Sequence, residues 1–581
     1  MTAGIEVSGP ACAAGTLPGT DVRDETAVLE SRGWSPVSLE CTPKLAALAA
    51  LAGLPAPEPV PSVSYRSQGN LLVIAGSDPA RAADAAASLS HDLHVTLVGG
   101  RGEAPPRVTG WQGRVESVEG YLGEFTALIA GLNGAAQPMP AHFDLVLDFS
   151  ASPLFAMRQP PQGYHHVGGG PVDAVVAELR ESVGEFEKPR FFAYRENICA
   201  HSRSEVVGCN ACIEICSTAA ISADGDHVKV DPHLCMGCGA CATVCPSGAM
   251  SYQYPRVADR LAQVKRLLRA YRDAGGCEAC VVFHNGTDGR ALLREAAAHG
   301  AGLPARALPL EAWHVAAEGL DVLLGAVAFG AAQVVVLSAG SEDREYLEAL
   351  RTHMEIGEEI LAGLGYTGTH FAVLEASSAE SLATAFSRLA PASAPAEAAT
   401  FAPTSDKRTG IEFAVEHLLR HAPRKAEEIA LPEHAPFGEV RVDREKCTMC
   451  MACVGACPES ALMDGVDQPL LKFVERNCVQ CGLCEATCPE EAISLSARLL
   501  LTPAVREARL LNETQPFHCV RCQKPFGTQQ MVRAMLGRLA GHSMFAGEGA
   551  LKRLQMCADC RVVDMMAAKD EVSVLRMGDQ A

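Results

Sequence analysis

The chain is poor in positive charge. Its 581 residues contain 49 Lys and Arg against 69 Asp and Glu, so the formal net charge is −20. Nucleic-acid binding needs clustered Lys and Arg that release counterions from phosphates, so this balance argues against a nucleic-acid partner. We expect an acidic body of this kind to dock on basic patches of partner proteins instead.

Signals for export and for membrane insertion are also missing. The N-terminus has no charged region followed by an apolar stretch and no twin arginine, so we expect no signal peptide. One segment, VLLGAVAFGAAQVVVLSAG at 322–340, is long and apolar enough to raise the question of a membrane span. It changes at Gln333 from Ala- and Gly-rich to β-branched, and no basic anchors flank it. The pattern favours a buried helix followed by a buried strand, and no membrane span.

Two signatures of enzymes are absent as well. The segment IAGSDPARAADAA follows a predicted strand and opens a helix, but it lacks the G-x-G-x-x-G of dinucleotide-binding folds. No nucleophile and base form a recognisable pair. The sequence therefore indicates an electron carrier or an oxidoreductase subunit without a substrate site of its own.

Cysteine, in contrast, is abundant. The chain has 24 cysteines, almost all in short-spaced groups. Disulfides do not form easily within C-x-x-C runs packed four at a time, so metal or cluster ligation in a reducing compartment is the better interpretation. This predicts a cytoplasmic location.

The length predicts about three to five folded units. Four cysteine groups are followed by near-copies, CSTAAIS, CPSGAMS, CPESALM and CPEEAIS, which predicts a repeated cysteine loop, helical turn and strand. The fold class is an α+β multidomain protein with two bacterial ferredoxin-like modules, two Rossmann-like α/β domains and a C-terminal zinc-ribbon-like unit. The expected boundaries are a flexible tail (1–62), an α/β domain (63–190), a ferredoxin-like module (191–256), an α/β domain (257–390), a linker and helix (391–438), a ferredoxin-like module (439–500) and a metal-binding unit with four cysteines (501–581).

Three runs have the full C-x2-C-x2-C-x3-C-P spacing of bacterial [4Fe–4S] ferredoxins. Three thiolates of such a run hold one cluster, while the fourth closes the neighbouring cluster. This crossing rule predicts three quartets: Cys447, Cys450, Cys453 with Cys488; Cys478, Cys481, Cys484 with Cys457; and Cys235, Cys238, Cys241 with Cys216.

A fourth quartet is incomplete by spacing. Cys209, Cys212 and Cys245 lack a ligand, because CNACIEIC has three cysteines where a full run has four. The candidate is Cys199, which nine residues separate from Cys209 where two are usual, so the chain would loop out and return at little entropic cost. His201 is a competing ligand, and an open three-ligand site with a three-iron cluster is a third possibility. The prediction is four [4Fe–4S] clusters.

The remaining cysteines divide into three sets. Two separated C-x2-C pairs, Cys519 with Cys522 and Cys557 with Cys560, match a structural zinc site, with a further iron–sulfur centre as the alternative. Cys12 and Cys41 need no role. Cys277 and Cys280, in CEACVVFHN, are expected to be free thiols because no second pair accompanies them.

The segment EKPRFFAYRENICAHSRSEVVGCNACIEICSTAAIS, together with DPHLCMGCGACATVCPSGAMSYQYP, resembles polyferredoxin-type proteins of proteobacteria encoded beside molybdenum formate dehydrogenases. The resemblance is most specific across 188–255. It implies electron transfer that serves a formate dehydrogenase or a similar molybdoenzyme, with redox proteins as partners. A maturation or sulfur-delivery scaffold for a molybdoenzyme is the alternative from another class.

Residues 277–390 are similar to the delta-type subunit that links hydrogenases to heterodisulfide reductases. CEAC falls at the start of this region, and EGLDVLLGAVAFGAAQVVVLSAG has the same helix and strand plan. That family carries further cysteines for a two-iron cluster where this sequence has LSAGSEDREY, which argues against a fifth cluster. The resemblance adds one alternative function, an electron-transfer subunit of a flavin-dependent disulfide reductase or hydrogenase complex.

Overall fold

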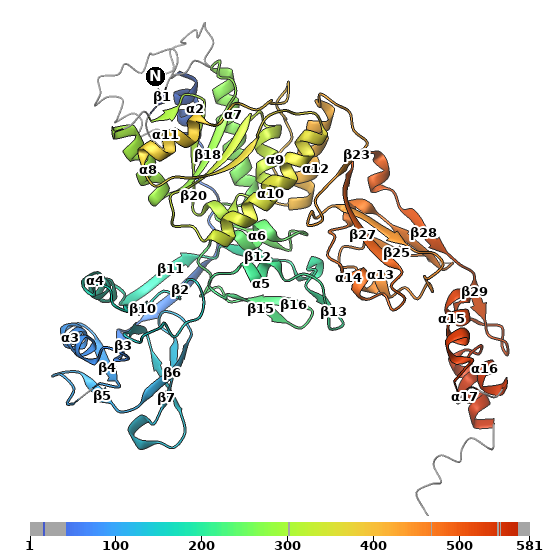
Figure 1. Ribbon diagram of the computed structural model, residues 1–581, viewed down its shortest axis with the longest axis horizontal. Helices are drawn as coiled ribbons and strands as arrows, with labels where there is room; N and C mark the ends of the chain where they lie inside the picture. Colours follow the sequence, from blue (N-terminus) through green and yellow to red (C-terminus); the bar gives the residue numbers. More distant parts are fainter. Residues whose placement is uncertain are drawn as a thin grey trace, which may run out of the picture.

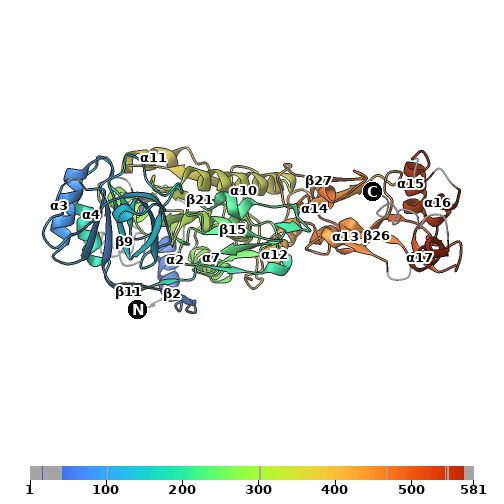
Figure 2. The same ribbon diagram turned by 90° about the horizontal axis from the view of Figure 1, so that it is seen from below.

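The computed structural model describes residues 16–17, 42–100, 102–299, 302–465, 468–542, 545 and 548–567. The molecule is elongated, with the sheet of the N-terminal part at one end and helices α15 to α17 at the other (Figures 1 and 2). The first cysteine-rich module lies at the centre of Figure 1, below the yellow-green helices and beside the second module. Its central position lets it contact the other large parts of the chain.

The N-terminal part contains a five-stranded parallel sheet of order β10-β9-β3-β4-β5. Alternate residues of β3 point to opposite faces, as a pleated strand requires. Leu71 and Val73 pack under helices α3 and α4, while Leu72 and Ile74 pack against an antiparallel sheet, β6-β7-β8. The bounds are β3 Asn70–Ile74, α3 Pro79–Leu89, β4 His94–Val98, β5 Thr109–Trp111, β6 Arg114–Glu119, β7 Phe125–Ala130, β8 Met139–Phe143, β9 Leu145–Asp148, β10 Tyr164–His166 and α4 Asp173–Glu181.

The strand order of this sheet reverses between β3 and β9, where a dinucleotide-binding fold would hold its ligand beyond the strand ends. At that point the turns after β3 and β9 approach each other closely. A Cβ on Gly76, in the turn after β3, would lie 2.5 Å from the Cα of Ser150, which follows β9. The Arg81 side chain also donates to the carbonyl of Gly168 (3.3 Å) beyond β10. The tight turn agrees with the missing glycine fingerprint.

The middle part is a four-stranded parallel sheet of order β20-β18-β21-β22, with helices between the strands. Helix α9 (Leu320–Ala328) is buried throughout and leads into the fully buried strand β21 (Gln333–Ser338). The predicted helix and strand are therefore confirmed. Within the described residues, no helix combines the length and apolar character needed to cross a bilayer. The other bounds are α7 Val257–Asp273, β18 Cys280–Asn285, α8 Asp288–His299, β20 Ala307–Ala312, α10 Arg344–Gly363, β22 Phe371–Glu375 and α11 Ala379–Ser387.

Two segments expected to be flexible are packed onto the middle part. Helix α2 (Thr42–Ala52) buries Ala47 and Leu48 in the same core as α7, so the prediction of a loose tail is wrong for this helix. In the expected linker, Ala399 is buried and its N–H donates to the Ala328 carbonyl (2.8 Å). Small apolar side chains let both segments fit closely, which their Ala- and Pro-rich composition alone did not reveal. Helix α12 (Lys407–Arg420) follows the linker.

Each cysteine-rich module repeats a loop, a short helix and a strand, as predicted. The first module has α5 (Ala211–Ile215) before β15 (Ile221–Asp224), and α6 (Ala240–Val244) before β17 (Met250–Tyr252). The second has α13 before β25 and α14 before β27, as in the first module. Further bounds are β12 Phe192–Tyr194, β16 His227–Val230, β24 Gly438–Val442, α13 Ala452–Ala456, β25 Leu462–Asp464, β26 Leu470–Phe473, α14 Leu483–Ala486, β27 Ile493–Leu500 and β28 Arg509–Glu513.

In its described residues, the C-terminal unit contains a hairpin and three α-helices. Strands β29 (Pro516–His518) and β30 (Pro525–Thr528) pair antiparallel, and α15 (Gln529–Leu539), α16 (Glu548–Arg553) and α17 (Ala558–Ala567) follow. The first cysteine pair lies between the two strands, whereas the second lies at the start of α17. The helical position of the second pair differs from the expected zinc-ribbon-like plan.

Candidate metal centres

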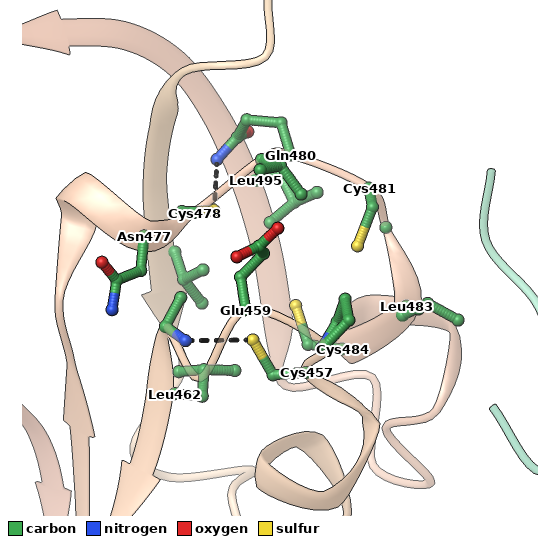
Figure 3. A pocket seen from close by; sticks show the side chains of 15 residues that line it. Cys457, Glu459, Leu462, Asn477, Cys478, Gln480, Cys481, Leu483, Cys484 and Leu495 are labelled. Carbon is green, nitrogen blue, oxygen red and sulfur yellow. Dashed lines mark hydrogen bonds between the residues drawn. The ribbon is translucent and has the colours of Figure 1, made fainter. Parts of the chain in front are cut away.

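In the second module, cysteines from two separate runs converge. The side chains of Cys457, Cys478, Cys481 and Cys484 line one pocket (Figure 3), in which the four sulfur atoms lie around a common space. A second pocket is lined by Cys447, Cys450, Cys453 and Cys488. In both cases three cysteines of one run meet the last cysteine of the other run. The chain therefore brings together the two quartets that the crossing rule predicts for this module.

In the first module, one pocket is lined by Cys216, Cys235, Cys238 and Cys241. The remaining cysteines also lie near one another, because Cys199 and Cys245 both act electrostatically on the thiols of Cys209 and Cys212. The nine residues between Cys199 and Cys209 contain a small hairpin of β13 (Ser202–Arg203) and β14 (Val206–Val207). The Cys209 N–H donates to the Ala200 carbonyl (2.9 Å), which returns the chain to its starting point.

His201, the competing ligand, is buried and lies beside the same quartet. Its Nδ1 is 3.1 Å from the carbonyl oxygen of Cys209. This backbone contact fixes the imidazole ring against the hairpin. The Cys199 thiol is buried, forms no disulfide and lies near Cys209 and Cys212. The geometry thus favours Cys199 as the fourth member of the quartet.

Three thiols of these quartets, those of Cys212, Cys453 and Cys481, are poor acids when no cation is present. Burial, followed by the charge of neighbouring cysteines, raises the pKa of Cys453 and of Cys212 to about 12. Burial, opposed by backbone N–H groups, raises the pKa of Cys481 to about 11. Thiolates in such a site need a metal centre that shares their charge, so the donor sets fit iron–sulfur clusters.

Backbone N–H groups are aimed at the sulfur atoms that close each run. The Ala461 N–H lies 3.2 Å from Sγ of Cys457, and the Ala492 N–H lies 3.4 Å from Sγ of Cys488. In the first module the Met250 N–H lies 3.4 Å from Sγ of Cys245. Such hydrogen bonds favour the thiolate and tune the potential of a bound cluster.

The four quartets are arranged in succession. Cys212 acts electrostatically on Cys241 within the first module, and Cys453 acts on Cys484 within the second. Between the modules, Cys209 acts on Cys481, and both pack against Leu483 at the boundary. The quartets of Cys199 and Cys457 are therefore the inner pair, and those of Cys216 and Cys447 are the outer pair.

The C-terminal cysteines form a much tighter group. The sulfur atoms of Cys519, Cys522, Cys557 and Cys560 all lie within 4.8 Å of one another, and those of Cys522 and Cys557 are 3.7 Å apart. Four thiolates at about 2.3 Å from one zinc ion in a tetrahedron lie about 3.8 Å apart. Although burial opposes ionisation, backbone N–H donors lower the pKa of Cys519 to about 6. The group fits a single metal ion.

Comparison with known families identifies the two modules. Models of the 4Fe–4S dicluster domain match residues 207–249 and 446–493. The chain carries two 4Fe–4S dicluster domains. This supports an iron–sulfur electron-transfer role. No curated protein matches the chain.

The α/β parts hold the first dicluster domain through its cysteine loops. Lys188 Nζ donates to the carbonyl of Cys235 (2.8 Å), and Thr243 Oγ1 donates to the Ala316 carbonyl (2.6 Å). Tyr346, from α10, is buried and hydrogen-bonds both Ser217 and the sulfur of Cys238. These contacts fix the outer quartet of Cys216 between the two sheets.

The remaining cysteines and the segment LSAGSEDREY give no sign of a fifth centre in the described part of the chain. Cys277 is disulfide-bonded, so its prediction as a free thiol is wrong, whereas Cys280 is a free thiol buried in β18. Within LSAGSEDREY, Glu342 accepts hydrogen bonds from Ser338 Oγ (2.6 Å) and Asn285 Nδ2 (2.7 Å). Hydrogen bonds to Glu342 thus tie this segment to β18 and β21. Cys12 and Cys41 lie outside the described residues.

Proposed function

We propose that this chain relays single electrons between redox partner proteins, with four [4Fe–4S] clusters and one structural zinc ion. The four quartets would hold the clusters as the crossing rule assigns them, with Cys199 completing the fourth. Each cluster, when bound, accepts and gives up one electron. The C-terminal quartet would hold zinc.

The observation that carries this proposal is the contact between the two dicluster domains at their cysteine loops. Cys209 and Cys481 both pack against the same small apolar cluster, which contains Ala200, Ala456 and Leu483. Separate storage or scaffold sites would need no such contact, whereas a relay requires neighbouring centres to lie close together.

The two ends of the succession differ in exposure. Cys450, in the outer quartet of the second domain, is exposed, and the C-terminal unit lies beside it because Thr528 Oγ1 donates to the Thr448 carbonyl (2.8 Å). The outer quartet of the first domain is enclosed by Lys188 and Tyr346 from the α/β parts. The Cys450 edge is therefore the accessible end for a partner protein.

The resemblance to proteins encoded beside formate dehydrogenases points to a formate dehydrogenase or a similar molybdoenzyme as the partner, in the cytoplasm. The net charge of −20 suits a partner with a basic docking face. The rival function is a maturation or sulfur-delivery scaffold, in which clusters would bind without rapid electron exchange.

Anaerobic metal analysis followed by rapid mixing tests the proposal. We expect about 16 iron atoms and a similar amount of sulfide per chain, four for each [4Fe–4S] cluster, together with one zinc ion. We also expect reduction and reoxidation fast enough to support turnover of a molybdoenzyme that co-purifies. Clusters that fill but exchange electrons more slowly than turnover would favour the scaffold.

A further inference from the structure

The first two residues of helix α12 reach into different dicluster domains. Lys407 Nζ donates to three carbonyl oxygens of the first domain, those of Ala242 (2.9 Å), Thr243 (2.6 Å) and Cys245 (3.0 Å). These carbonyls belong to the C-terminal end of helix α6 and to the cysteine that follows it. A cation at this position also meets the negative end of the helix dipole.

Arg408 makes the equivalent contacts with the second domain. Its guanidinium donates to the carbonyls of Pro436 (2.7 Å), Arg476 (2.9 Å) and Cys478 (3.0 Å), and lies 4.5 Å from the centre of the Phe437 ring. Successive residues of a helix point about 100° apart, since one turn takes 3.6 residues. Two neighbouring side chains can therefore serve two domains.

Geometry fixes both side chains as cations. An ammonium group has three N–H donors and a neutral amine has two, so the three carbonyl contacts of Lys407 require the charged form. Lys407 is only 7% exposed, and burial lowers the pKa of its amine, while the buried Asp321 side chain opposes that shift. The three carbonyl acceptors hold the ammonium form. Arg408 carries a guanidinium, which stays protonated in proteins.

The start of α12 is itself anchored. The side chain of Asp406 caps the helix by accepting from the Thr409 N–H (3.0 Å). The same carboxylate pairs with Arg195 of the first dicluster domain (3.3 Å). The positions of Lys407 and Arg408 are thus set by the chain on both sides.

We propose that Lys407 and Arg408 act together as a clamp on the two inner quartets. The clamp fixes the separation of the quartets of Cys245 and Cys478, and raises the reduction potentials of the clusters they would hold. A cluster gains negative charge on reduction, and a nearby cation in a poorly solvated site stabilises the reduced form. This inference rests on the proposed function, because it concerns the clusters of the relay.

The first test is an anaerobic redox titration of the full chain, followed by electron paramagnetic resonance. The variants are Lys407→Gln and Arg408→Gln, with Cys245→Ser and Cys478→Ser used to assign the two signals. We expect each Gln variant to lower the reduction potential of its own cluster by at least about 59 mV. For one electron this is a tenfold change in the reduction equilibrium. The reduction potential of the other inner cluster should change less.

Two residues beyond the C-terminal end of α12 supply matched controls. Lys425 Nζ donates to the carbonyls of Leu419 (2.6 Å) and Arg420 (2.8 Å), and Arg424 donates to the Gly363 carbonyl (2.7 Å). Lys425→Gln and Arg424→Gln remove the same kinds of contact away from the quartets, so both potentials should stay at the wild-type value. Equal shifts in control and test variants would overturn the electrostatic part of the inference.

A second pair of variants tests the separation. Lys407→Arg and Arg408→Lys keep each charge but change the donor geometry, so the potentials should stay close to wild type. The magnetic broadening between the two inner signals should weaken. If a Gln variant fails to retain its iron, Lys407→Arg and Arg408→Lys still show, through the magnetic broadening, whether the clamp sets the separation of the two inner clusters.

Unchanged potentials in Gln variants with full iron content, or unchanged broadening in all four variants, would refute the clamp. The proposed function fails separately, if wild-type protein with full clusters exchanges no electrons with redox proteins. The shifts in potential would still be readable in that case.

Discussion

Gly208 and Leu483 meet across the boundary between the two dicluster domains, so closely that no side chain fits between them. A Cβ on Gly208 would lie 2.6 Å from Cγ of Leu483 and 2.8 Å from the Ala200 carbonyl oxygen. Close packing leaves no room for such an atom unless the domains separate. Any side chain at position 208 would clash with Leu483, so only glycine fits before Cys209 at this boundary.

Gly208→Val should therefore move the two domains apart. We expect the magnetic broadening between the inner clusters to fall, while the broadening within each domain persists. Pulsed and continuous-wave electron paramagnetic resonance of the reduced protein would measure it. Gly455→Ala is the control, because a Cβ there meets no atom within 4 Å. Equal broadening in both variants would contradict the importance of this contact.

Cys199 and His201 can be distinguished by iron content. Cys199→Ser should lose a cluster, so iron should fall from about 16 to about 12 atoms per chain, or to about 15 if a three-iron cluster remains. His201→Gln should retain all the iron, because the imidazole contacts the Cys209 backbone (3.1 Å). The reverse result would assign the ligand to His201.

Tyr346→Phe removes one hydrogen bond to the sulfur of Cys238. Loss of a donor to a ligating thiolate destabilises the reduced form, so the potential of the outer cluster in the first domain should fall. The fall in potential should correspond to less than a tenfold change in the reduction equilibrium, since a single neutral donor is lost. Tyr366→Phe also removes a buried hydroxyl, bonded to the Leu418 carbonyl (2.9 Å), and should leave all potentials unchanged.

The C-terminal metal should stabilise its own unit and nothing else. Cys557→Ser should abolish zinc binding and increase hydrogen exchange across the hairpin and α17, with the iron content unchanged. Met556→Leu, a change at a buried neighbour of Cys557, should keep both the zinc and the protection. Iron in place of zinc at this site in protein expressed with both metals would refute the zinc assignment.

His353 should make the middle part sensitive to acid. Burial first, and then Lys407 and His434, lower its pKa to about 3. The unfolded chain therefore binds the extra proton below the ordinary value of about 6.5 and the folded chain does not, so stability falls as pH decreases. The cost should be about 1.4 kcal/mol at pH 5.5, from that difference in protonation.

Hydrogen exchange of α10 at pH 7.5 and pH 5.5, corrected for intrinsic rates, would measure this opening free energy. His353→Leu removes the titrating group and should flatten the pH dependence of exchange in α10. Wild-type exchange that is independent of pH over this range would show that His353 does not control the stability of the helix.

The cysteine groups of this protein could be predicted from local sequence. Cysteine spacing is a short-range property, so the runs that begin at Cys235, Cys447 and Cys478 could be grouped without coordinates. The change at Gln333 from small to β-branched residues likewise predicted the helix and strand that the structure contains. In each case the signal lies within about 20 residues of the feature that it predicts.

Only the tertiary structure decided the relations between distant segments. Sequence composition predicted that helix α2 and the linker are flexible. This prediction failed because the burial of small apolar residues cannot be recognised until the surface against which they pack is known. The roles of Lys407 and Arg408 depend on cysteine carbonyls that lie 162 and 70 positions away along the chain. Backbone carbonyls leave no mark on the sequence, so a cation that caps them is visible only in three dimensions. The sequence determined how the thiols are spaced along the chain, and the packing determined that the quartets follow one another.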